Sequence, residues 1–125
     1  MGMLAAHAMF ELPLLQMSSN VRTGGHQWFA EGVATFGLVA TIIGVLNAQP
    51  KAVPYAVGLY ITAGYWFTAS TSFANPAVTV ARSFTDTFSG IMPLNAPAFI
   101  VAQLVGAVVA TYCLVWLIDK DWDSP

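Results

Sequence analysis

The sequence predicts an all-α membrane protein with three transmembrane helices and one re-entrant half-helix. Hydrophobic residues make up 57% of its 125 residues, and charged residues make up only 8%. A soluble domain carries about 25% charged residues, so this deficit indicates that lipid surrounds the chain. Three apolar segments, 28–48, 55–72 and 97–118, are long enough to cross a hydrocarbon core of about 30 Å as helices.

The composition excludes several classes of function. The net charge is −2 and the four basic residues are scattered, so the chain offers no surface for nucleic acid. Cys113 stands alone in an apolar run, which predicts neither a disulfide framework nor a thiol metal site. His7 and His26 have no further ligands at metal spacing, and we interpret both as incidental loop histidines. No cofactor is expected.

Residues 1–27 are predicted to form the end of a helix followed by a loop. Glu11 and Pro13 interrupt the first apolar stretch, and a polar stretch that contains Gly24-Gly25 follows it. No basic region precedes the apolar stretch, so we expect no cleavable signal peptide. At the other end, residues 119–125 are expected to form a short, acidic, solvated tail.

The segment 73–92 lies between two of the predicted spans. Asn75 followed by Pro76 is typical of a helix start, because the Asn side chain caps free N–H groups and proline lacks an N–H to leave unpaired. The small and apolar residues that follow predict a helix of about three turns that stops at Gly90 and Pro93. Such a helix is too short to cross a bilayer, so it must be buried in protein or line a water-filled cavity. Its N-terminal end, aimed at a pore centre, would favour neutral polar solutes and repel cations.

In this setting the triplet Asn75-Pro76-Ala77 resembles the signature of the major intrinsic proteins, the aquaporin and glycerol-channel family. The resemblance extends over nearly the whole chain and is to the C-terminal half of such a channel. It implies one of two inverted repeats, each of which supplies a half-helix that reaches the membrane midplane. The implied function is passive permeation of water and small uncharged solutes, without enzymatic chemistry.

The resemblance also implies roles for the residues of the triplet. Asn75 would orient the permeant by hydrogen bonding, and Pro76 and Ala77 would shape the helix start and its contact with the partner loop. Most family members carry an arginine directly after the triplet, whereas this chain carries Val78. An apolar side chain there should leave a wider, less polar constriction and looser selectivity.

Two further features bear on the solute. The expected filter residue on the preceding helix is Tyr65, with Ala63 as the rival, because the loop before Asn75 is about two residues shorter than in common members. The run from Asn75 to Arg82 and the residues after it are similar to bacterial members that accompany arsenic-resistance genes. Arsenite in its neutral acid form is therefore an implied solute, beside glycerol.

Glu31 is an ionisable residue within a predicted span, which marks a candidate functional site. From the residues alone it could instead lie near enough to the helix end to reach water. The resemblance implies a different role, because Glu31 and Thr35 keep an acid–threonine spacing that recurs in the family. Glu31 would accept hydrogen bonds from backbone N–H groups of the re-entrant loop and buttress it.

Two other patterns concern packing rather than transport. Arg82 and Asp86 lie four residues apart, so they share a helix face and are predicted to pair. Ala102, Gly106 and Ala110 repeat at four-residue spacing, which predicts a close-packed helix face in lipid.

A lone half-channel would leave Asn75 and free N–H groups without a partner half-helix, which lipid penalises. We therefore expect a complementary N-terminal half or an antiparallel second copy, with a tetramer of completed pores as a further possibility. The alternative is a non-conducting truncated fragment or an assembly subunit, and the apparent start inside a helix favours truncation or a split partner. An intramembrane enzyme is excluded, because no nucleophile–base pair or metal cluster is present.

The resemblance places the chain in a bacterial plasma membrane with a cytoplasmic C-terminus. Lys51 and Lys120 would then lie inside, and Arg22 and Arg82 towards the outside. Because this count is a tie, the positive-inside rule gives no orientation.

Overall fold

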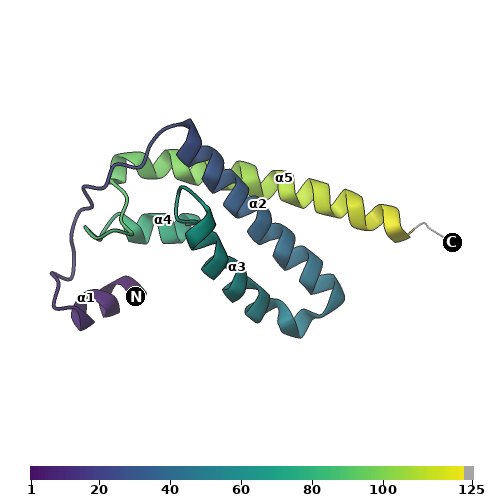
Figure 1. Ribbon diagram of the computed structural model, residues 1–125, viewed down its shortest axis with the longest axis horizontal. Helices are drawn as coiled ribbons and strands as arrows, with labels where there is room; N and C mark the ends of the chain where they lie inside the picture. The colour runs from purple at the N-terminus through teal and green to yellow at the C-terminus, as the bar shows by residue number, and fades with distance from the viewer. Residues whose placement is uncertain (123–125) are drawn as a thin grey trace.

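The computed structural model describes residues 1–122, and this part of the chain is helical without a β-strand (Figure 1). The prediction of an all-α fold is confirmed. The helices are α1 (Gly2–Met9), α2 (Gly25–Ala48), α3 (Val53–Phe67), α4 (Pro76–Arg82) and α5 (Ala96–Trp122), with short 3-10 turns η1 (Pro50–Ala52) and η2 (Pro93–Asn95). The last three residues of the predicted tail, 123–125, lie outside the described residues.

Helices α2 and α5 are the long elements of the fold, and both are apolar and long enough to cross a membrane. They have 24 and 27 residues, or about 36 and 40 Å at about 1.5 Å per residue. A Cβ atom on Gly106 of α5 would lie within 3.1 Å of the Gly32 backbone of α2. Ala110 on the same face is completely buried. The close-packed face predicted from the small residues is thus confirmed.

Helix α3 returns beside α2 as the second arm of a hairpin (Figure 1). The Tyr60 hydroxyl of α3 donates to the carbonyl of Ala34 in α2 at 2.9 Å. The helix has 15 residues, or about 22 Å, and it ends at Phe67, five residues before the predicted boundary. The chain leaves the helix at Thr68, which is extended and whose hydroxyl bonds back to the Gly64 carbonyl at 2.7 Å.

Residues 68–74 form an irregular segment, the strap, between α3 and α4. Three of its residues, Thr71, Ser72 and Ala74, have positive φ angles of 64°, 49° and 51°. Residues other than glycine rarely adopt positive φ angles, so surrounding contacts must hold the strap in place. The strap therefore depends on the groups that bond to its backbone.

Helix α4 has seven residues and about two turns, so the predicted three-turn helix up to Gly90 is wrong. It ends at Arg82 because the backbone beyond it bonds to a distant segment. The N–H of Ser18 donates to the Ser83 carbonyl at 3.0 Å, and the N–H of Gln16 donates to the Phe84 carbonyl at 3.3 Å. Carbonyls that accept these bonds are directed away from the helix axis. The local sequence does not show that residues 16–18 compete with the helix for these carbonyls.

The segment 16–22, predicted as a loop, runs alongside residues 83–95 and is anchored there. Asn20 accepts from the N–H of Met92 at 2.7 Å, and its side chain donates to the carbonyl of Thr87. The N–H of Arg22 donates to the Asn95 side chain at 3.1 Å. These bonds fix the region that follows α4.

The buried apolar core is small. Its main cluster is formed by Phe73, Ile91 and Phe99, with Val78 packed against them. The rings of Phe73 and Phe99 lie 5.3 Å apart. Most large apolar side chains of α5 face outwards, as expected for a chain whose surroundings are lipid.

We expect Gly106→Ala to destabilise the α2–α5 contact by about 1–3 kcal/mol, because the new methyl group would meet the Gly32 backbone rather than a side chain that can move. Thermal unfolding in detergent followed by circular dichroism measures this change. Gly44→Ala is the matched control, since a Cβ on Gly44 of α2 meets nothing within 4 Å. Equal behaviour of the two variants would contradict the close contact.

Candidate functional site

Glu31 lies at the centre of the site, completely buried in α2. One oxygen, Oε1, accepts from the Ser70 hydroxyl at 2.7 Å and from the N–H of Phe73 at 2.8 Å. The other, Oε2, accepts from the N–H of Ala74 at 3.0 Å and from the Gln103 amide at 2.7 Å. All four partners are donors, which matches an ionised carboxylate that only accepts. Glu31 therefore binds the backbone of the strap directly and does not reach out to water.

Gln103 is a site residue that the sequence analysis missed. It is buried in α5, and its Nε2 donates both to Glu31 and to the Thr79 hydroxyl of α4, the latter at 2.8 Å. The amide thereby joins α2, α4 and α5. An isolated glutamine within an apolar span was the available signal, because a polar side chain in lipid needs a partner.

Thr35 differs from its expected role. It is buried one turn after Glu31, but its hydroxyl has no hydrogen-bond partner within residues 1–122. The carboxylate that accepts hydrogen bonds from the strap is therefore that of Glu31, which also binds Gln103. Thr35 is buried and contributes packing only.

Asn75 caps α4 in the way the sequence indicates. Its side-chain oxygen accepts from the N–H groups of Ala77 at 2.8 Å and Val78 at 3.4 Å. In the described part of the chain its amide NH₂ has no acceptor, and Asn75, Pro76 and Ala77 are all exposed. The structure therefore presents the triplet, with two free N–H donors of Asn75, on an open surface.

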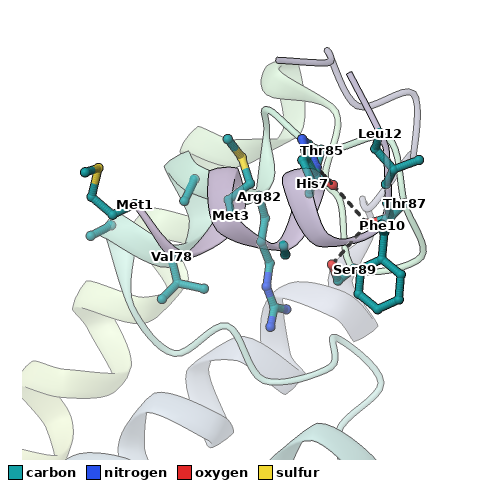
Figure 2. Close-up of a pocket in the computed structure, with 14 residues that line it drawn as sticks. Met1, Met3, His7, Phe10, Leu12, Val78, Arg82, Thr85, Thr87 and Ser89 are labelled. Atoms are coloured by element: carbon teal, nitrogen blue, oxygen red, sulfur yellow. Dashed lines mark hydrogen bonds between the residues drawn. The ribbon is translucent and has the colours of Figure 1, made fainter. Parts of the chain in front are cut away.

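A cavity of about 920 Å³ lies between α1 and α4. In Figure 1, α1 lies below α4. Its α4 wall includes Val78 and Arg82 (Figure 2). A row of polar groups forms another wall: His7 contacts the Thr85 hydroxyl at 2.7 Å, and Thr85 continues to Thr87 at 3.0 Å. The cavity thus offers hydrogen-bonding groups from His7 and the segment after α4, beside apolar groups from both α1 and α4.

His7 is not an incidental loop residue, as the sequence suggested. It lies in α1 with 2% of its surface exposed. Its other ring nitrogen bonds to the Leu14 carbonyl at 3.0 Å. His26, by contrast, is exposed at the start of α2. No cluster of three or more potential metal-ligand side chains occurs in residues 1–122.

Arg82 and Asp86 do not pair, which corrects the prediction. The carboxylate of Asp86 accepts from both the N–H and the hydroxyl of Ser19, each at 2.8 Å. These bonds hold the pKa of Asp86 below its ordinary value. The guanidinium of Arg82 lies instead over the Phe73 ring, 4.3 Å from its centre, and its Nη1 lies 3.5 Å from the Thr71 hydroxyl.

The two candidate filter positions on α3 differ in their surroundings. Tyr65 is partly buried and lies within electrostatic range of both Arg22 and Arg82. Ala63 is exposed. Tyr65 thus lies near both arginines.

We expect Glu31→Gln to destabilise the fold by about 1–3 kcal/mol for each strap donor left facing an amide NH₂. Hydrogen–deuterium exchange at Phe73 and Ala74 should accelerate, because these N–H groups lose a carboxylate acceptor. Thr35→Val is the matched control, since it removes a hydroxyl without a partner and should change neither measurement. Unchanged exchange in Glu31→Gln would show that the carboxylate does not hold the strap.

Comparisons with known proteins agree with this geometry. The profile of the family described as major intrinsic protein matches residues 45–123. The chain is 62% identical over 118 residues to the aquaglyceroporin AqpS of Rhizobium meliloti (strain 1021), an alignment that covers 94% of this chain and 51% of AqpS. The chain thus spans about half the length of that relative, and no solved structure matches it. Since the family profile covers more than half of the chain, this integral membrane protein belongs to the major intrinsic protein family, whose members are channels and not enzymes.

Proposed function

We propose that the chain supplies the C-terminal half of a passive channel for water and small uncharged solutes. The observation that carries this proposal is the strap that Glu31 holds in front of α4, which leaves the amide of Asn75 exposed and free to donate. The name of the relative, an aquaglyceroporin, supports glycerol as a solute. Arsenite in its neutral acid form is the second solute that we propose, from the similarity around Asn75.

In this proposal the exposed NH₂ of Asn75 donates to the oxygen of the permeant. Pro76 and Ala77, exposed beside it, contact the half-helix of the other half. Val78 and Tyr65 set the width of the constriction. Glu31 buttresses the strap, with Thr35 packed behind it, so that the N-terminus of α4 keeps its position as solutes pass.

The open surface around the triplet supports a second half. In a hydrocarbon environment the exposed donors of Asn75 would be unpaired, which costs several kcal/mol per group. A complementary N-terminal half, or an antiparallel second copy of this chain, would enclose them in a water-filled path. Completed pores would then assemble as tetramers in a bacterial plasma membrane, with the C-terminus cytoplasmic.

The proposal is tested by stopped-flow light scattering on proteoliposomes, challenged osmotically with sucrose and then with glycerol. The chain is reconstituted alone and together with the first half of AqpS as the complementary half. We expect faster volume changes than in protein-free vesicles in at least one preparation, and their loss in Asn75→Asp. If both preparations match empty vesicles although the protein is inserted and helical, the chain is a non-conducting subunit or fragment.

We further expect Val78→Arg to lower glycerol and arsenite permeability more than water permeability in the conducting preparation. A long cationic side chain would narrow the constriction, and a larger solute is hindered more than water. Glycerol and water permeabilities measured on the same vesicles give the ratio. Equal loss of both would contradict the assignment of Val78 to the constriction.

A further inference from the structure

The guanidinium of Arg82 lies far from its own backbone. Arg82 is the last residue of α4, one turn beyond Val78, so its Cα is about 6 Å further along the helix. Helical side chains lean towards the N-terminus, and this one reaches back to Thr71 and Phe73 in the strap. Figure 2 shows it extended, with the guanidinium pointing away from His7 and Thr85. The charge therefore lies beside the strap rather than beyond the end of the helix.

Arg22, the other arginine, provides a contrast within the same region. Its guanidinium donates to the carbonyls of Gly90 and Phe88 at 2.7 Å each and to that of Ser70 at 3.4 Å. It also lies 5.4 Å from the Phe73 ring centre. Arg22 thus uses its donors on backbone carbonyls and ties the strap to the segment 88–90.

Arg82 keeps most of its donors free. Of the five N–H groups of a guanidinium, one is bonded within residues 1–122, to the Thr71 hydroxyl at 3.5 Å. Its remaining nitrogens are not enclosed, and the side chain lines the cavity between α1 and α4. A partly buried cation with free donors at the wall of a cavity can bind a solute that enters.

No carboxylate neutralises this charge at contact distance. Within residues 1–122 Arg82 forms no ion pair, and both oxygens of the nearby Glu31 already accept two hydrogen bonds each. Arg22 adds a second positive charge near the same ring. In a region of low dielectric these charges repel an approaching cation more strongly than they would in water.

We propose that Arg82 is the charge-selecting residue of the pathway. Its guanidinium, placed beside the strap by Phe73 and Thr71, excludes cations and donates hydrogen bonds to the oxygens of polyols and neutral oxyacids. This inference rests on the proposed channel function and adds to it, because the apolar Val78 leaves the constriction without a charge of its own.

Flux measurements on the conducting preparation test this role. Arg82→Gln removes the charge but keeps an N–H donor, so potassium and proton leak should rise by roughly tenfold or more while water permeability stays within about twofold. Arg82→Lys keeps the charge but loses the planar fork, so exclusion of cations should persist while the glycerol-to-water ratio falls. Lys51→Gln, which removes an exposed charge in η1, should match the wild type. A cation leak in Arg82→Gln no greater than in Lys51→Gln would overturn the proposal, provided that both variants unfold at the wild-type temperature.

A second measurement decides the placement of Arg82 without any flux. Phenylglyoxal modifies guanidinium groups, and this chain has two arginines that peptide mass spectrometry distinguishes. We expect Arg82 to react at least several-fold faster than Arg22 in the reconstituted protein, and glycerol to slow its reaction. An unreactive Arg82 would overturn the proposal. Vesicles that conduct nothing while Arg82 reacts as expected would overturn the channel function instead.

Discussion

The structure depends on four hydrogen bonds to one buried carboxylate. The strap between α3 and α4 is irregular, and in lipid its N–H groups cannot turn to water. Glu31 accepts from two of them and from the hydroxyl of Ser70, so it supplies the partners that a helix would otherwise have supplied. Because the two oxygens also take the amide of Gln103, the strap is fixed to both long helices at once.

These bonds require that α2 and α5 approach closely. Glu31 is followed by Gly32, and Gln103 lies three residues before Gly106, so the glycine contact and the hydrogen bond occupy neighbouring levels of the same interface. A larger residue at Gly106 would separate the helices and lengthen the bond between the polar side chains. The small residues therefore serve the site as well as helix packing, since they set the distance over which a buried acid and amide can meet.

The two arginines divide the positive charge of this region between structure and solute. Arg22, from the segment that follows α1, bonds to backbone carbonyls and keeps the turns around Gly90 in place. Arg82, from α4, stacks on Phe73, lines the cavity and has one side-chain hydrogen bond, to Thr71, within residues 1–122. The Phe73 ring thus contacts both guanidinium groups near the strap. The selectivity that we propose depends on Arg82, because the donors of Arg22 are already bonded to backbone carbonyls.

The sequence by itself determined the features that arise from neighbouring residues and from composition. The apolar segments 28–48 and 97–118 predicted the two long helices α2 and α5. Asn75-Pro76 predicted the start of α4, because capping acts within one turn. The row at Ala102, Gly106 and Ala110 predicted a packing face, because small residues at four-residue spacing lie on one side of a helix. Tertiary structure decided what depends on distant partners. It ended α4 at Arg82 through bonds to residues 16–18 and brought Gln103 to Glu31. It also turned Arg82 away from Asp86 towards Phe73, because spacing along a helix shows which side chains could meet but not which distant groups compete for them.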